Sequence, residues 1–173
     1  MSAVMPPSAG STTARRDGKP GRPVNEDFLD LLRLLLGAGA RFLIVGAHAM
    51  AVHGVPRATG VLDIWVDPDP ANAQRAWQAL LEFGAPVREM GVAQEDLETP
   101  GIVLQIGQPP RRIDLLTQAS GLSFAEAWSN RVTHAIEGLA IPFVGRDDLV
   151  LNKRASGRPK DLADLDVLEK NPL

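Results

Sequence analysis

Two aspartates, each set in an apolar stretch, are the residues of this sequence whose types and positions could do chemistry. Asp63 lies inside the run VLDIWV, and Asp114 lies inside the later run RRIDLLT. An unpaired carboxylate that becomes buried costs several kilocalories per mole, so something should hold Asp63. A divalent cation is one candidate, because Mg²⁺ takes oxygen ligands and usually only one or two carboxylates. Asp114 could complete such a site for one ion together with Asp63.

The residue two places before Asp63 limits what this site could do. Alternate residues of a strand point to the same face, so residue 61 should face the same side as Asp63. Two acids at these places could hold two ions, but residue 61 is Val. Asp67 cannot take its place, since four residues of strand separate it from Asp63 by about 13 Å. We expect Asp67 and Asp69, which flank Pro68, to serve as turn and helix-cap residues.

Ion pairing is the structural alternative to metal binding for the two acids. Arg57, Arg111 and Arg112 are the arginines that could hold Asp63 or Asp114. An arginine can satisfy both oxygens of a carboxylate at once. The sequence leaves both explanations open, although the presence of both acids behind a glycine turn favours a metal site.

A pair of small residues follows the first apolar run. Gly46 and Ala47 come directly after FLIV, and the small-residue segment that continues from them can form a short helix. Small residues at this place would let the backbone amides of the helix approach a phosphate group. Close packing of the helix on the strand demands small residues as well. Both interpretations of Gly46 and Ala47 stay open at this point.

Residues that could contact phosphate lie in two other places. Arg57 and Thr59 belong to the turn PRATG, which leads into the run that carries Asp63. Arg57 could make a bidentate contact with phosphate, or it could hold Asp63 instead. Lys153, on a predicted helix near the C-terminus, is our first choice for a phosphate contact. For Lys160, an ion pair on a helix face is an equally good explanation.

Hydrophobic periodicity predicts the elements that must position these residues. Asn25 should cap a helix whose apolar residues recur at helical spacing as far as Leu36. We predict further helices from residue 70, over 124–128 and from 147 onward, and strands over 41–45, 61–66, near Val87, and over 102–106, 111–116, 132–136 and 139–144. Strands interleaved with helices and closed by a hairpin indicate an α+β fold, with a mixed β-sheet and flanking helices.

The length and composition limit the domain organisation. With 173 residues, of which 45% are hydrophobic, the chain is long enough for one domain with a proper core. We interpret residues 24–173 as that domain, with a helical C-terminal part. Residues 1–23 are rich in Ser, Pro, Gly, Thr and basic residues, so we expect a disordered N-terminal tail there.

Charge, cysteine content and hydropathy argue against several functional classes. The net charge of −3 argues against a broad, nonspecific nucleic-acid surface. The chain has no cysteine, which excludes disulfides, zinc thiolates and cysteine nucleophiles. No apolar run approaches the roughly 20 residues of a membrane span, and the N-terminus lacks the apolar region of a signal peptide. We therefore expect a cytoplasmic protein with no membrane partner.

The order of these elements resembles a known fold. A strand, Gly46-Ala47, a small helix, the PRATG turn and an acid-bearing strand resemble the minimal nucleotidyltransferase fold of the polymerase-beta superfamily. Within it, the chain is similar to the bacterial AbiEii-like nucleotidyltransferases, which usually carry Asp-x-Asp on the second strand and a third acid on a later strand. Asp63 matches the second acid and Asp114 the third, while Val61 replaces the first. The run NKRASGRPKD resembles the ending of the same family.

The resemblance implies a Mg²⁺-dependent transfer of a nucleoside monophosphate from an NTP to a hydroxyl group of RNA or protein. Several relatives belong to toxin–antitoxin modules and act on tRNA or on a partner protein, so a cognate toxin or antitoxin is an expected partner. Asp63 and Asp114 would be the catalytic and metal-binding residues, and Asp114 would receive the proton of the acceptor. The implied nucleotide-binding residues are Gly46, Ala47, Arg57, Thr59 and Lys153.

Val61 supports an alternative function of a different class. An isopropyl group in place of a carboxylate removes a metal ligand and a full negative charge. Losing such a ligand can lower the rate of a metal-dependent transfer by several orders of magnitude. The alternative is therefore a catalytically degenerate module of a toxin–antitoxin system, which binds a nucleotide or a partner without turnover.

Overall fold

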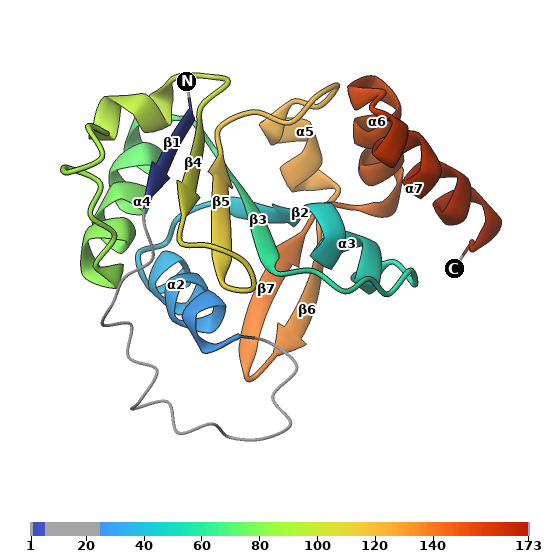
Figure 1. Ribbon diagram of the computed structural model, residues 1–173, viewed down its shortest axis with the longest axis horizontal. Coiled ribbons are helices and arrows are strands. Elements are labelled where there is room, and N and C mark those ends of the chain that lie inside the picture. The colour runs from blue at the N-terminus through green and yellow to red at the C-terminus, as the bar shows by residue number, and fades with distance from the viewer. Residues whose placement is uncertain (1, 6–24, 173) are drawn as a thin grey trace.

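Helices and strands are interspersed along the chain (Figure 1). The computed structural model describes residues 2–5 and 25–172. Its strands are β1 (Ser2–Met5), β2 (Phe42–Val45), β3 (Val61–Val66), β4 (Val103–Ile106), β5 (Arg112–Leu116), β6 (Val132–Ile136) and β7 (Leu139–Phe143). Its helices are α2 (Glu26–Gly37), α3 (Gly46–Val52), α4 (Pro70–Phe83), the 3₁₀ helix η1 (Gln94–Glu98), α5 (Phe124–Ser129), α6 (Arg146–Ser156) and α7 (Pro159–Lys170). Among these described helices, none combines the length and the apolar character needed to cross a membrane.

The strands join in one mixed sheet. Their order across the sheet is β1-β4-β5-β3-β2-β7-β6. β3 pairs with β5 in parallel, and so does β2 with β7, whereas β2–β3, β4–β5 and β6–β7 are antiparallel pairs. β1 extends the sheet at one edge, where it runs parallel to β4. The predicted α+β fold, with a mixed sheet and flanking helices, is confirmed.

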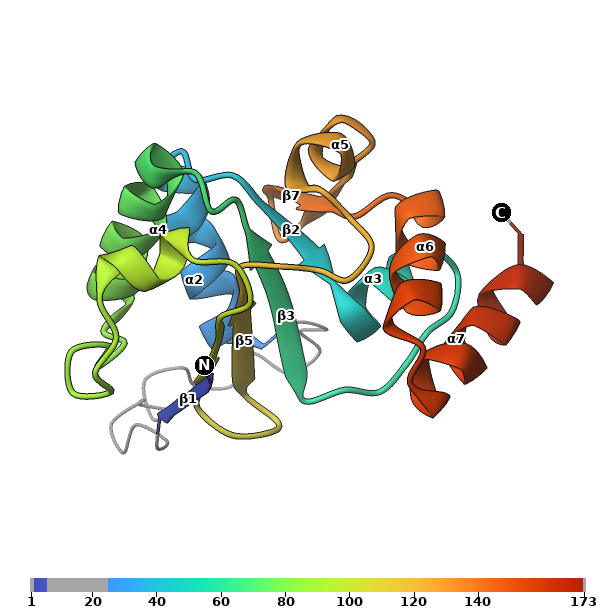
Figure 2. The same ribbon diagram turned by 90° about the horizontal axis from the view of Figure 1, so that it is seen from above.

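The helices cover the two faces of the sheet in separate groups. α2 and α4 lie on one side of the sheet, and α3, α6 and α7 lie on the other (Figure 2). The Trp65 ring of β3 meets the Phe124 ring of α5 edge-on, with 5.0 Å between the ring centroids. Alternate residues of a strand share a face, so Val61 and Asp63 face the same side of the sheet as Trp65. The two residues of interest therefore lie on the side of α5, away from α2 and α4.

Side-chain caps begin the two helices of the α2–α4 layer. At the start of α2, the side-chain oxygen of Asn25 accepts a hydrogen bond of 2.8 Å from the backbone N–H of Asp27, as predicted. Asp69 caps α4 by accepting a hydrogen bond of 3.2 Å from the backbone N–H of Asn72. Asp67 in turn accepts one of 3.1 Å from the backbone N–H of Asp69. The predicted turn and cap roles of Asp67 and Asp69 are confirmed.

Two predictions need correction. The residues that follow Val87 form a turn rather than a strand, in which the N–H of Val92 donates to the carbonyl of Val87 at 2.9 Å. Val87 follows Pro86 and is itself followed by charged residues. So short an apolar segment has no periodicity that could distinguish a strand from a turn. The expected disordered tail over residues 1–23 is wrong for Ser2–Met5, because β4 offers these residues a backbone partner that composition does not reveal. The remainder of that tail lies outside the described residues.

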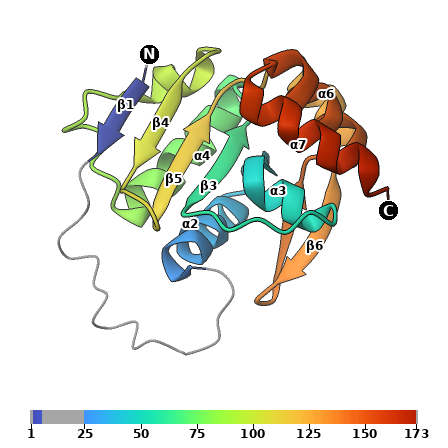
Figure 3. The same ribbon diagram turned by 45° about the vertical axis from the view of Figure 1, so that its right-hand side comes forward.

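The C-terminal helices form a bent pair. Gly157 ends α6 in the left-handed conformation, with φ of 64°, and Pro159 begins α7. The helical part predicted from residue 147 onward thus consists of two helices. The bend turns α7 back along α6, and both helices lie near α3 (Figure 3). This pair is therefore on the same side of the sheet as Asp63.

Candidate functional site

Asp63 and Asp114 are direct neighbours in the sheet. β3 and β5 run in parallel, and the register of this pair places Asp63 opposite Asp114. Adjacent strands lie about 5 Å apart, so both side chains rise from the same face at one position along the sheet. Only 10% of the Asp114 side chain is exposed. The expected convergence of the two acids is confirmed, while their catalytic role stays a prediction.

The electrostatic state of Asp63 shows how these acids influence each other. Burial raises the pKa of the Asp63 carboxyl to about 6, and the negative charge of Asp114 adds to this rise. The positive charges of Lys160, Arg112 and Lys153 act in the opposite direction. Within the part of the chain that the structure describes, Asp63 has no hydrogen-bond or ion-pair partner of its own. A further cation beside this carboxyl would stabilise its charged form.

Asp114 differs from Asp63 because an arginine holds it. Arg112, two residues earlier on β5, donates from Nε to Oδ1 of Asp114 at 2.9 Å. Its Nη2 donates to Oδ2 at 3.1 Å, so the guanidinium engages both oxygens. The sequence named this ion pair as the structural alternative to metal binding, and for Asp114 that alternative is the arrangement observed.

Val61 completes the group on this face of the sheet. The register that joins Asp63 to Asp114 also places Val61 opposite Arg112. Four side chains therefore project from neighbouring positions of β3 and β5, and we call them the acid-pair face: Val61, Asp63, Arg112 and Asp114. Because residue 61 is Val, Arg112 meets no carboxylate directly across on β3.

Gly46 lies in direct contact with Asp63. Its φ is +70°, a left-handed value that favours glycine, and it begins α3. A Cβ added at this position would stand 2.2 Å from Oδ2 of Asp63, so no side chain fits. The contact supports the packing explanation for Gly46. The role of Gly46 and of the following Ala47 in binding a nucleotide stays a prediction.

Arg57 and Thr59 position the turn before β3. Arg57 forms an ion pair with Asp164 of α7, so it does not hold Asp63 as one alternative supposed. The Thr59 hydroxyl accepts a hydrogen bond of 3.1 Å from the backbone N–H of Val61, which fixes the start of β3. The structure thus gives both residues a structural contact, and their contact with a nucleotide stays a prediction.

Lys153 lies in a buried group of charges between α6 and α7. Its ammonium group is 2.9 Å from Asp164 and 3.4 Å from Asp161. Only 6% of Lys153 is exposed. We call this group, completed by two arginines, the C-terminal ion cluster: Arg57, Lys153, Arg158, Asp161 and Asp164. The sequence favoured a phosphate contact for Lys153 over an ion pair, whereas the structure shows ion pairs with Asp161 and Asp164.

The charge balance of the C-terminal ion cluster is local. Burial would raise the pKa of Asp161, but hydrogen bonds from Arg158 and Ser156 and the charge of Lys153 lower it to about 2. Sequence analysis missed Asp161 and Asp164 as partners of Lys153. Their spacing of three residues places them on one helix face, which was the available signal. What the sequence did not reveal is that α7 folds back after Gly157 so that this face packs against α6.

The donor set of the acid-pair face suits one Mg²⁺ ion and not two. Among the described residues, His, Asp and Glu side chains form no group of three or more that could hold a metal ion. Asp63 and Asp114 supply two carboxylates side by side, and Mg²⁺ usually takes one or two, with other oxygens from water and phosphate. Asp63 has a raised pKa that a cation would relieve. For Asp114 to join, Arg112 has to release it.

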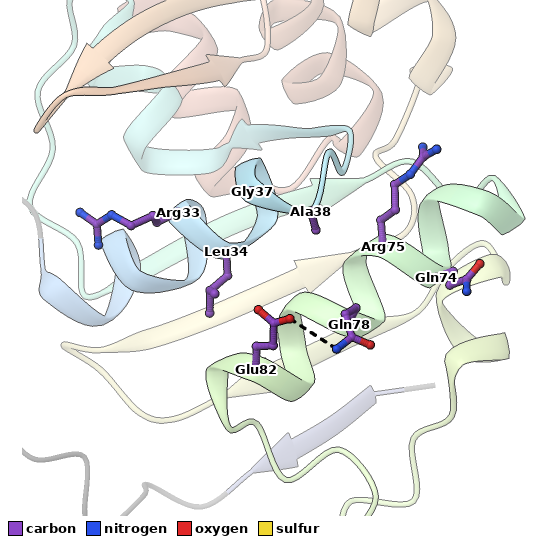
Figure 4. A pocket seen from close by; sticks show the side chains of 8 residues that line it. All are labelled: Arg33, Leu34, Gly37, Ala38, Gln74, Arg75, Gln78 and Glu82. Atoms are coloured by element: carbon purple, nitrogen blue, oxygen red, sulfur yellow. Dashed lines mark hydrogen bonds between the residues drawn. The ribbon is translucent and has the colours of Figure 1, made fainter.

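A groove on the other side of the sheet does not share this chemistry. It lies between α2 and α4, where the Gln78 amide and Glu82 approach each other at 3.4 Å (Figure 4). Its lining residues are Arg33, Leu34, Gly37, Ala38, Gln74, Arg75, Gln78 and Glu82. It contains one carboxylate and lies on the side of the sheet away from Asp63, so we do not place the functional site there.

Solved structures of nucleotidyltransferases are similar to this chain over most of its length. One is the lincosamide antibiotic adenylyltransferase LnuA with lincomycin bound, at 13% identity and a TM-score of 0.53, covering 84% of this chain and 96% of LnuA. Another is TM1012 of Thermotoga maritima, provisionally named a nucleotidyltransferase, at 13% identity and a TM-score of 0.51, covering 88% of this chain and 97% of TM1012. No protein-family model and no curated protein matches the sequence. The chain therefore has the nucleotidyltransferase fold that its strand order and acid-bearing strands had suggested.

Proposed function

We propose that this protein binds an NTP at the acid-pair face and transfers its nucleoside monophosphate to a hydroxyl group of RNA or protein. The observation that carries the proposal is the register of β3 and β5, which sets Asp63 beside Asp114. Positive groups surround the pair, since the charges of Lys160, Arg112 and Lys153 act on Asp63. An acid pair ringed by cations suits a metal-bound triphosphate, which carries both signs of charge. The nucleotidyltransferase fold supports the same conclusion.

In this function the residues of the chain hold and orient the reactants. A Mg²⁺ ion held by Asp63 and Asp114 would supply charge stabilisation to the triphosphate. Gly46 and Ala47 would admit the phosphates close to the backbone, and Arg57, Thr59 and Lys153 would lie around them. Asp114 is the proposed proton acceptor for the incoming hydroxyl, a role that again requires Arg112 to free one of its oxygens.

A second candidate function is nucleotide or partner binding without turnover. Two observations favour it: Val61 stands where an acid would complete a two-ion site, and Arg112 holds both oxygens of Asp114. The resemblance to AbiEii-like proteins makes a cognate toxin or antitoxin the proposed partner, in the bacterial cytoplasm. In this role the acid-pair face would bind ligand and leave it unchanged.

One set of variants tests these two functions together. Wild type, Val61→Asp and Asp63→Asn are incubated with Mg²⁺, total RNA or protein and radiolabelled NTPs, and NTP binding is measured separately by calorimetry. Labelling by wild type that Asp63→Asn abolishes is the result expected for a transferase. Labelling by Val61→Asp alone shows a silenced enzyme and supports the second function. Nucleotide binding in the absence of labelling by any variant also supports it, and a lack of both overturns both functions.

Growth of a bacterial expression host tests independently whether this protein is the toxin of a toxin–antitoxin pair. If the protein is the toxin of a pair, its production arrests growth, and Asp63→Asn relieves the arrest because the acid pair is broken. An arrest that Asp63→Asn leaves unchanged contradicts a role of the acid-pair face in toxicity.

Lincomycin belongs among the acceptors tested in vitro, because the similar protein LnuA is named a lincosamide adenylyltransferase.

A further inference from the structure

Arg112 occupies the carboxylate that a metal ion at this site would need. Both of its contacts to Asp114, at 2.9 Å and 3.1 Å, are direct, and they engage both oxygens. A cation bound to the same oxygens would stand within a few ångströms of the guanidinium charge, where like charges repel strongly. Arg112 and a divalent cation therefore compete for Asp114.

We propose that Arg112 is a ligand-exchange residue, which leaves Asp114 when a divalent cation binds and then holds a phosphate group of the nucleotide. This inference rests on the proposed function, and it adds to that site a residue that sequence analysis treated only as a salt-bridge partner. The planar fork that engages a carboxylate matches the geometry of a phosphate equally well. Arg112 thus contacts Asp114 in the absence of the cation and a phosphate group when cation and nucleotide are bound.

The sheet register leaves a displaced guanidinium with no acid across from it on β3. The position opposite Arg112 is Val61, whose side chain cannot accept a hydrogen bond. The remaining acid of the face, Asp63, would be bound to the cation. The Arg112 side chain is 30% exposed, so it has solvent-side room to turn away from Asp114. An incoming phosphate is then the anion available to it.

Three of the neighbouring cations are held by carboxylates of the C-terminal ion cluster. Lys153 is held by two buried carboxylates, and Arg57 by one of them, Asp164. Arg158 donates to Asp161 at 2.6 Å, and a hydrogen bond from Ser156 joins the same carboxylate. Moving any of these three would leave a buried acid with one partner fewer, which costs free energy. Releasing Arg112 leaves no such acid, because the entering cation replaces it at Asp114.

The exchange makes cation and nucleotide binding depend on each other. A cation alone must displace Arg112 without a new anion to receive it, so its affinity is low. A nucleotide supplies that anion, so each ligand should raise the affinity of the other by the same factor. The cation affinity in the absence of nucleotide is therefore the quantity that reports the competition directly.

The experiment uses the full chain and Arg112→Gln, with Mn²⁺ as the cation and a non-hydrolysable ATP analogue as the nucleotide. Electron paramagnetic resonance measures Mn²⁺ binding without nucleotide, and calorimetry measures analogue binding at saturating Mn²⁺. We expect Arg112→Gln to bind Mn²⁺ about 10-fold more tightly and the analogue about 10- to 100-fold more weakly. A purely structural salt bridge would not produce opposite changes in the two affinities.

Two further variants keep the test decisive. Arg111→Gln removes the same charge one residue away, where the side chain pairs with Asp27 at 3.2 Å, and it should change neither affinity. If Arg112→Gln does not fold, Arg112→Lys keeps the charge but loses the fork, and it should weaken analogue binding without tightening Mn²⁺ binding tenfold. Equal Mn²⁺ affinities of wild type and Arg112→Gln overturn the competition. Failure of wild type to bind the analogue overturns the proposed function instead.

Discussion

The acid-pair face and the C-terminal ion cluster both bury charge, but they balance it differently. In the C-terminal ion cluster, Asp161 and Asp164 are 1% and 2% exposed, and each lies against basic side chains from another turn or helix. On the acid-pair face, Asp114 has Arg112, and Asp63 has no direct partner among the described residues. A cluster that is balanced within the chain serves the fold, whereas a buried acid with a raised pKa and no partner is a candidate functional residue.

The largest effect should come from removing the central cation of the C-terminal ion cluster. Lys153→Met leaves two buried carboxylates with one fewer partner, and we expect the free energy of unfolding to fall by about 3–5 kcal/mol. Urea unfolding at neutral pH measures this change. Lys170→Met is the matched control, because its ion pair with Asp166 is exposed and should contribute less than about 1 kcal/mol. Similar losses for both variants would show that the cluster does not hold α7 in place.

Asp63→Asn should raise the free energy of unfolding, in contrast to Lys153→Met. The folded protein holds the Asp63 proton up to a pH of about 6, above the ordinary value of 3.8, so wild type loses stability as pH rises between these values. In metal-free buffer above pH 6, we expect Asp63→Asn to be more stable than wild type by at most about 3 kcal/mol. Urea unfolding across pH 3 to 8 checks this prediction. A stability difference that does not grow between pH 4 and 6 would show that Asp63 is already balanced.

Gly46→Ala should have the next largest effect on stability, because it forces a Cβ against Oδ2 of Asp63 at a left-handed position. Gly39→Ala is the matched control, since Gly39 has φ of 71° but no atom lies within 4 Å of an added Cβ. We expect Gly46→Ala to cost about 2 kcal/mol more than Gly39→Ala in thermal unfolding. In an Asp63→Ala background this excess should vanish. If the excess persists there, the strain at Gly46 does not come from Asp63.

The smallest expected effect concerns an exposed ion pair beside the cluster. Arg154 lies 2.8 Å from Glu169, and more than half of each side chain is exposed. Arg154→Ala should change the free energy of unfolding by less than about 1 kcal/mol, and salt should reduce the effect further. Unfolding in low and high salt measures both. A large, salt-independent loss would extend the C-terminal ion cluster to the surface of α6 and α7.

Sequence reasoning predicted the strands of the site because their signals are local. The apolar runs around Asp63 and Asp114 have strand length and β-branched residues, and the caps at Asn25 and Asp69 mark helix starts. Pairing between distant segments is another matter. The partner of β1 lies about 100 residues away, at Val103–Ile106, and nothing in the composition of residues 2–5 points to it.

The contacts of the site were predicted less well than its acids, for the same reason. Lys153 was assigned to phosphate because it lies in a basic run, on a helix that ends at Gly157, whereas its neighbours in space are Asp161 and Asp164. Arg57 meets Asp164 across more than a hundred residues. The order of acids along the chain indicates the fold, but the partner of a long, flexible basic side chain depends on helix packing that one sequence does not specify.

The parallel pairing of β3 and β5 has a consequence for how this protein tolerates change. Asp63 meets Asp114 because of a ladder of backbone hydrogen bonds, and side-chain rotation plays no part in that alignment. A single inserted residue early in β5 would turn Asp114 toward the layer of α2 and α4. It would also place Ile113 or Leu115 on the acid-pair face. Point substitutions can therefore adjust the chemistry of this face gradually, whereas insertions and deletions within these two strands should abolish fold and site together.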